Sequence, residues 1–293
     1  MNKITNVLSN RRDSARLLVL FTHLVLNGYY DLMGLVLALC NQVNESIIAY
    51  PRLIAKLGGC ILRETQTIYC LEFEGLKWKI RKTISTDFKF GVLLDIVGEP
   101  YQYWRWFDKY LDNVETFIDV GAYIGGYSVR ALRKNVDVYA IEANPKNFEF
   151  LSSNLKMNCQ DSTAISYNIA AGSRKETKAL YMAASRDGFL TSSLVGADGR
   201  DFVGEIEVYP LDNLFLHENL KKPIFVKIDV EGSEPDVIKG AKHILMETDY
   251  VMVEVSNETR LLVDKIFNTL NFRKVDRYRT YSFYIKKNLY DKT

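Results

Sequence analysis

From residue 116 onward, short apolar runs alternate with longer stretches that carry helix signals. Five of these runs have the length and the apolar character of buried strands: 116–120, 136–141, 162–169, 224–228 and 250–255. Asn144-Pro145 and Ser233-Glu234-Pro235 follow two of the runs and are typical of helix starts. The alternation predicts an α/β fold, a doubly wound parallel sheet with helices on both faces. The runs 272–275 and 281–285 predict a closing antiparallel pair.

A different pattern occupies the segment between the third and fourth runs. Residues 177–182 and 205–209 have strand-like composition, whereas 186–200 is rich in glycine and serine and lacks apolar periodicity. We expect strands joined by a loop that covers the mouth of a ligand site. Ser192 and Ser193 lie in this loop, where they either contact a bound molecule or form a polar turn.

The first part of the chain, residues 1–111, is predicted to form a helical and hairpin cap on a sheet domain of residues 112–293. The segments 67–73 and 76–80 alternate polar and apolar positions around the turn signal Glu74-Gly75. This pattern predicts a β-hairpin within the cap.

An unusually apolar segment, Leu17–Cys40, lies inside the predicted cap. It is long enough to span a membrane, but Asn27-Gly28 is a turn signal at its middle and Asp31 interrupts it. Two short helices that pack on each other or on the sheet domain explain the segment better. A membrane span and an amphipathic hairpin that lies on a membrane surface stay open as alternatives.

The turn after the first run, Gly121 to Gly126 in TFIDVGAYIGG, connects a strand directly to a helix start. Such a turn lets backbone N–H groups and the positive end of the helix dipole approach a ligand closely. About twenty residues later the second run ends in Glu142, where a carboxylate can accept two hydrogen bonds from a ribose. Together these features predict a nucleoside cofactor in an open α/β sheet.

Glycine spacing and charge decide which nucleoside cofactor fits this turn. The glycines do not match the G-x-G-x-x-G fingerprint of dinucleotide sites, and Asp119 would repel a pyrophosphate. S-adenosylmethionine has no phosphate, and its sulfonium and ammonium groups are attracted by a carboxylate. Ala170 belongs to a stretch of small residues against which an adenine ring can lie flat. The predicted S-adenosylmethionine-binding residues are Asp119, Gly121, Ala122, Tyr123, Ile124, Gly125, Glu142, Ala143, Asn144, Ala170 and Asp229.

Acidic residues also follow the fourth run and lie near the end of the fifth, at the edge where the carboxyl ends of parallel strands meet. Methyl transfer to a hydroxyl requires that the acceptor is aligned and that its proton is removed or shared. Asp229, Glu231 and Glu254 are therefore the candidate catalytic residues, with Asp229 the first choice for acceptor contact or base and Glu231 the next. A Mg²⁺ site built from Asp229, Glu254 and Asn257 would have an incomplete oxygen set, so we predict no metal.

Five sequence blocks occur in an order that is typical of one enzyme family. They are TFIDVGAYIGGYSV, IEANPKNFEFLSSNL, GFLTSSLVG, VYPLDNLF and VKIDVEGSEPDVIKGA. In these blocks the chain resembles the FkbM-type S-adenosylmethionine-dependent methyltransferases, over roughly Ile84 to Lys287. The octet K-I-D-V-E-G-S-E is the most specific piece. The resemblance implies a Rossmann-like, seven-stranded methyltransferase sheet and O-methyl transfer to a sugar, a lipid-linked sugar or a secondary metabolite.

Composition narrows the alternatives without changing this interpretation. The chain has 293 residues, 47% hydrophobic and 25% charged, with a net charge of +2, which gives no electrostatic case for nucleic-acid binding. RNA methylation on the same fold is the first alternative, and the D-V-E-G sequence at the fourth strand end disfavours it. A membrane-peripheral module with a vestigial cofactor fold is the second, and the intact acidic strand ends argue against it. We expect a cytoplasmic enzyme with a small-molecule or glycan acceptor and, through Leu17–Cys40, a peripheral membrane contact as an open alternative.

Overall fold

The computed structural model describes residues 61–64, 68–73, 76–81, 102–184, 190–194 and 200–290. These residues fall into two compact units. The first unit contains a three-stranded antiparallel sheet in the order β1 (Ile61–Glu64), β2 (Ile68–Phe73) and β3 (Leu76–Arg81). Phe73 pairs with Leu76, so β2 and β3 form the predicted hairpin. The predictions for Leu17–Cys40 lie outside the described residues.

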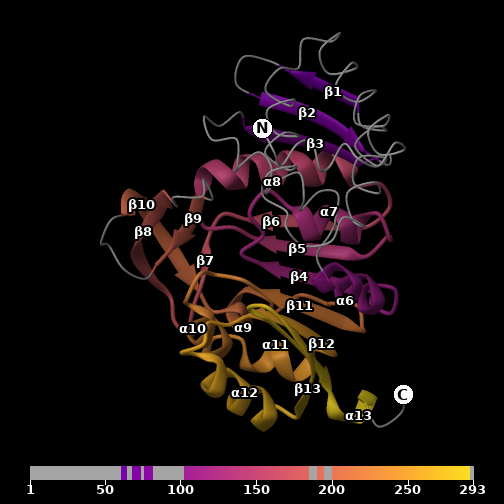
Figure 1. The fold of residues 1–293 in the computed structure, drawn as a ribbon, viewed down its shortest axis with the longest axis vertical. Coiled ribbons are helices and arrows are strands. Elements are labelled where there is room, and N and C mark those ends of the chain that lie inside the picture. The colour runs from indigo at the N-terminus through magenta and orange to yellow at the C-terminus, as the bar shows by residue number, and fades with distance from the viewer. Residues whose placement is uncertain are drawn as a thin grey trace, which may run out of the picture. The chain divides into compact units, whose positions relative to one another are not determined.

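The second unit is built around a seven-stranded sheet (Figure 1). Its strands along the chain are β4 (Thr116–Val120), β5 (Asp137–Ile141), β6 (Ala164–Tyr167), β11 (Ile224–Ile228), β12 (Tyr250–Glu254), β13 (Phe272–Tyr278) and β14 (Tyr281–Lys286). Their order across the sheet is β13-β14-β12-β11-β4-β5-β6. The first five strands are parallel to one another, and β14 is antiparallel to both β12 and β13. The predicted parallel sheet with a closing antiparallel pair is confirmed.

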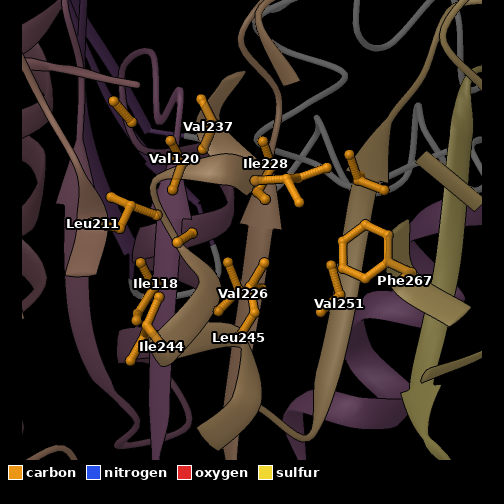
Figure 2. Close-up of a cluster of buried hydrophobic side chains, with 14 of the residues drawn as sticks. Ile118, Val120, Leu211, Val226, Ile228, Val237, Ile244, Leu245, Val251 and Phe267 are labelled. Atoms are coloured by element: carbon orange, nitrogen blue, oxygen red, sulfur yellow. The ribbon is translucent and has the colours of Figure 1, made fainter. Parts of the chain in front are cut away.

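Helices cover both faces of this sheet because its strands are apolar on both sides. The helices of the second unit are α6 (Gln102–Leu111), α7 (Gly126–Leu132), α8 (Pro145–Asn158), α9 (Leu211–Leu214), α10 (Glu234–Lys239), α11 (Lys242–Glu247), α12 (Arg260–Thr269) and α13 (Lys287–Tyr290). On one face, side chains of β4, β11 and β12 pack against α9 to α12 in a single buried cluster, in which Val226 and Phe267 lie (Figure 2). On the other face, Phe107 of α6 packs edge-on against Phe117 of β4 and Tyr127 of α7. None of the helices in the described residues is long and apolar enough to cross a membrane.

A second, four-stranded sheet is inserted between β6 and β11. Its strands are β7 (Ala170–Ala171), β8 (Glu176–Ala184), β9 (Leu190–Ser193) and β10 (Arg200–Tyr209), in the order β7-β10-β8-β9. The strands predicted at 177–182 and 205–209 are confirmed.

The loop predicted over 186–200 was wrong at Leu190–Ser193, which forms β9. This strand is four residues long, lies at the edge of the sheet and takes its backbone hydrogen bonds from β8. A short edge strand of this kind needs no apolar alternation, and the sequence pattern therefore gave no signal for it.

Candidate active site

The glycine-rich turn between β4 and α7 lies against the end of β11. Gly121 has a φ of +78°, and a Cβ atom placed there would lie 1.7 Å from the carbonyl oxygen of Asp229. The backbone N–H of Asp229 donates to the carbonyl of Val120 over 2.9 Å, which fixes this approach. Gly125 adopts a φ of +94° and precedes α7. Only glycine fits at position 121, because a side chain would collide with backbone rather than with a movable group.

Glu142, at the end of β5, is joined to the same turn through its carboxylate. One of its oxygens accepts from the backbone N–H of Tyr123 over 2.9 Å, and the other accepts from the backbone N–H of Asn144 over 2.9 Å. Burial raises the pKa of Glu142 to about 7, although these backbone hydrogen bonds favour the charged form. A carboxylate has about four acceptor positions, so it can receive a further hydrogen bond from a ligand hydroxyl.

Three asparagines hold the remaining predicted cofactor-binding residues in place. Asn154 of α8 donates to the carbonyl of Ile124 over 2.8 Å, and the Asn144 side chain caps α8 by accepting from Lys146. Asn168 donates to the carbonyls of Glu142 and Ala143. Ala143 in turn packs on the cluster that contains Ala170. The structure thus gathers these residues around the ends of β4 and β5, and their contact with a cofactor stays a prediction.

Lys227, on β11, is a central residue of the site that the sequence analysis missed. Its ammonium group lies 3.3 Å from a carboxylate oxygen of Asp119 and 3.2 Å from one of Asp229. It also donates to the carbonyl of Gly121 over 3.3 Å and lies over the ring of Tyr127. Burial opposes the charge of Lys227, but the two carboxylates outweigh it and raise its pKa above the usual value. This ammonium group therefore links the ends of β4 and β11.

The carboxylate of Asp119 interacts with other side chains of the protein. Its side chain is fully buried, and its second carboxylate oxygen accepts a 2.7 Å hydrogen bond from the hydroxyl of Ser128. Because Lys227 and Ser128 neutralise and orient this carboxylate, its first role in the structure is to fix the turn. Its predicted attraction for a positively charged cofactor stays a prediction.

Asp229 and Glu254 form a carboxyl pair at the ends of β11 and β12. Tyr281 of β14 donates its hydroxyl hydrogen to Asp229 over 2.7 Å, and Thr280 donates to Glu254 over 2.9 Å. Burial opposes the charge of Asp229, yet Lys227, Glu254 and Tyr281 together hold its pKa below the usual value. Burial and the neighbouring Asp229 raise the pKa of Glu254 to about 9. The two shifts have opposite directions, so these surroundings favour the charged form of Asp229 and the protonated form of Glu254.

Glu231 completes the acidic group that the sequence predicted. Oxygen atoms of Asp229, Glu231 and Glu254 lie within 4.8 Å of one another. Glu231 has a φ of +55°, and Glu234 holds its turn by accepting from the backbone N–H groups of Val230 and Gly232.

The side-chain oxygen of Asn257 accepts a hydrogen bond from Arg277 over 3.3 Å. The structure gathers Glu231 with the other two carboxyl groups, so all three candidate catalytic residues share one place.

The part of the chain that contains these residues matches a known protein family. The sequence profile of the Methyltransferase FkbM domain matches residues 119–281, from Asp119 to Tyr281. The chain belongs to the FkbM methyltransferase family. The resemblance that the sequence blocks indicated is therefore confirmed, and the matched range begins and ends on residues of the site described above.

The chain is also similar to characterised proteins and to solved structures. It is 28% identical over 142 residues to the hexuronic acid methyltransferase AglP of Haloferax volcanii, which is 47% of this chain and 54% of that protein. The chain thus spans about half the length of this curated relative. A methyltransferase structure from Agrobacterium tumefaciens covers 77% of this chain and 72% of its own, with 9% identity and a TM-score of 0.42. TrmK of M. capricolum, bound to S-adenosylhomocysteine, covers 64% and 69%, with 13% identity and a TM-score of 0.37.

Proposed function

We propose that this protein transfers a methyl group from S-adenosylmethionine to a hydroxyl group of a small molecule or glycan. The observation that carries the proposal is the position of Asp229. It is held ionised by Lys227 and Tyr281, and its backbone lies against Gly121 of the glycine-rich turn. The acceptor side and the cofactor side of the predicted site therefore meet at one residue.

The residues around the turn fit S-adenosylmethionine by their chemistry. The absence of a side chain at Gly121 lets the turn pack directly against the end of β11, and Glu142 at the neighbouring strand end can accept from a ribose hydroxyl. Carboxyl groups outnumber ammonium groups among Asp119, Lys227, Asp229 and Glu231, which favours a cationic ligand over a phosphate. When bound, S-adenosylmethionine supplies an electrophilic methyl group next to its sulfonium.

Asp229 is suited to hold and orient an acceptor hydroxyl. Its ionised carboxylate can accept the hydroxyl hydrogen, which directs an oxygen lone pair away from the carboxylate. A low pKa makes Asp229 a weak base toward a resting alcohol. Such a base is sufficient if the proton leaves late, because the O–H becomes strongly acidic as the alcohol oxygen gains the methyl group as its third substituent. Tyr281 orients Asp229 by donating its hydroxyl hydrogen over 2.7 Å, and the neighbouring Glu254 favours its protonated form.

A sugar hydroxyl is the acceptor that we favour. The named relative is a hexuronic acid methyltransferase, and it shares 28% identity with this chain over 142 residues. Sugars present the weakly acidic aliphatic hydroxyls for which positioning by a carboxylate is the main requirement. From this relative we infer only that the acceptor is a sugar. We do not infer which sugar it is.

Two measurements test the proposed function. Isothermal titration calorimetry with S-adenosylmethionine and S-adenosylhomocysteine should show binding by the wild type and by Asp229→Asn. Transfer of a labelled methyl group to a panel of mono- and oligosaccharides should occur with the wild type and fall at least a hundredfold in Asp229→Asn. Asp201→Asn, an exposed change on β10, is the matched control and should keep full activity. Absence of cofactor binding by the wild type would refute the proposal.

A further inference from the structure

The inserted sheet carries an aromatic pair in the same row as a serine that contacts the acidic group. Phe202 of β10 pairs directly with Tyr181 of β8, and Tyr181 pairs directly with Ser193 of β9. Side chains of directly paired residues lie on the same face of a sheet. The three residues therefore form one row across three adjacent strands, which lie side by side in Figure 1.

One end of this row contacts the loop that carries the acidic group. Ser193 is buried, and its hydroxyl donates to the carbonyl of Glu231 over 2.9 Å. Glu231 in turn lies within 4.8 Å of Asp229 and Glu254 by its carboxylate. The face that carries Tyr181 and Phe202 is thus the face of the inserted sheet that meets the predicted acceptor position.

The opposite face of the inserted sheet packs in a buried apolar cluster. Leu180, Ile206 and Val208 form a small buried cluster with Ala170, and Ala143 packs on it. Met182 accepts a weak hydrogen bond from Asn144 on that side. The buried apolar side chains of the inserted sheet lie on this opposite face, and Phe202 does not belong to their cluster.

Phe202 is instead one of the most exposed large apolar side chains of the described residues. It is 61% exposed, and its ring contacts the half-buried Tyr181 edge-on, with 5.9 Å between the ring centroids. The row runs from exposed Phe202 through Tyr181 to buried Ser193. With neighbouring strands about 4.8 Å apart, Phe202 lies about 10 Å from Ser193 along the sheet.

We propose that Tyr181 and Phe202 form a binding subsite for a sugar ring of the acceptor glycan next to the ring that is methylated. This rests on the proposed function and deepens it by assigning an oligosaccharide as the preferred acceptor. Aromatic faces are negative and attract the weakly positive C–H face of a pyranose. Phe202 contacts Tyr181 edge-on, and the row ends at Ser193, which donates to the carbonyl of Glu231.

The test compares Phe202→Ala with wild type on an oligosaccharide and on the matching monosaccharide. From the panel used above, the best oligosaccharide of two to four hexose or hexuronic acid units is chosen with its terminal monosaccharide. Phe202→Ala should raise KM for the oligosaccharide about tenfold, which corresponds to about 1.4 kcal/mol. The kcat for the oligosaccharide and the KM for the monosaccharide should stay within twofold of wild type.

Three further measurements test whether the change in KM is due to the loss of the aromatic ring at position 202. Phe202→Tyr should restore the wild-type KM, since a phenol ring keeps the aromatic face. Leu261→Ala, which removes a side chain that is 75% exposed on α12, should change neither constant. Calorimetry should show unchanged S-adenosylmethionine binding by Phe202→Ala, because Phe202 is not among the predicted cofactor-binding residues.

The outcomes separate this inference from the proposed function. An equal KM change for both acceptors, no change for either, or a shift in oligomeric state with Phe202→Ala by analytical ultracentrifugation would overturn the subsite. In the last case, Phe202 contacts a second copy of the chain. A wild type that binds S-adenosylmethionine but methylates no saccharide would refute the proposed acceptor class, and the subsite with it.

Discussion

Replacing Lys227 by methionine tests whether the site depends on one buried ammonium group. Lys227 is 2% exposed, and its ammonium lies 3.3 Å from Asp119 and 3.2 Å from Asp229. Methionine has nearly the same length, so the change leaves the packing volume in place and removes the charge. It leaves the fully buried carboxylate of Asp119 without a counter-ion. Breaking a buried ion pair in this way costs about 3–5 kcal/mol.

Urea and thermal unfolding followed by far-UV circular dichroism should show this loss. At about 2–4 °C per kcal/mol for a domain of this size, the midpoint should fall by about 6–20 °C. Lys221→Met is the matched control. Lys221 forms an ion pair with Asp137 at 2.8 Å, but 65% of its side chain is exposed, so its removal should change the midpoint far less.

The pH dependence of the Lys227→Met deficit has a definite sign. Asp229 has a lowered pKa, so the stability that it contributes is present above about pH 4 and is lost as the pH falls. Lys227 has a raised pKa, so its contribution is present below about pH 10 and is lost as the pH rises further. The deficit should be largest between these limits and should shrink in acid, where the carboxylates are protonated.

A second substitution separates charge from packing. Asp119→Asn added to Lys227→Met removes the orphaned charge and should recover part of the lost stability, so the double variant should be more stable than the sum of the single changes predicts. A Lys227→Met midpoint equal to that of wild type, or a double variant that recovers nothing, would show that the ammonium group does not organise the site.

Substitutions at Gly121, Glu142 and Tyr281, with Gly232 as a control, probe the other parts of the site. Gly121→Ala should abolish S-adenosylmethionine binding in calorimetry, because its Cβ would meet the Asp229 carbonyl at 1.7 Å. Gly232→Ala, with a φ of +102° but nothing within 4 Å of the Cβ, should keep most of the binding. Glu142→Ala should weaken cofactor binding by about 1.5–3 kcal/mol per lost charge-assisted hydrogen bond. In the wild type, the affinity for S-adenosylmethionine should rise as the pH passes about 7, where Glu142 ionises. In Glu142→Gln, which cannot ionise there, the affinity should not change with pH over this range. Tyr281→Phe removes a hydrogen bond to ionised Asp229, so the acid limb of the pH–rate profile should move to higher pH, and an unmoved limb would contradict this.

Much of the fold could be predicted because its signals are local. Strands such as Ile224–Ile228 are buried on both faces and are therefore apolar except for Lys227, and the acidic residues at the strand ends stand out in the sequence. Parallel strands end at a common edge, so Asp229 and Glu254 could be placed together without coordinates. The confirmed antiparallel closure at β13 and β14 followed from the same apolar pattern.

The missed residues depend on pairings between distant parts of the chain. The sequence does not show that Lys227 is buried and paired, because its partner Asp119 lies 108 positions away. The pairing becomes evident only when β4 and β11 are known to be neighbouring strands. Tyr281 reaches Asp229 because β14 runs antiparallel to β12 and pairs Tyr281 with Glu254. An isolated lysine in the middle of an apolar strand, two residues before an aspartate, was the available signal for Lys227.

The close approach of Gly121 to the Asp229 carbonyl has a consequence for how this enzyme can be re-engineered. With no room for one carbon atom between them, the loop after β4 and the end of β11 form a single rigid junction. A substitution that shifts either loop displaces both, so under the proposed function the binding of the methyl donor and of the acceptor cannot be tuned separately at that point. Directed changes of acceptor preference are better made on the outer strands of the insertion, where the backbone of the junction is left untouched.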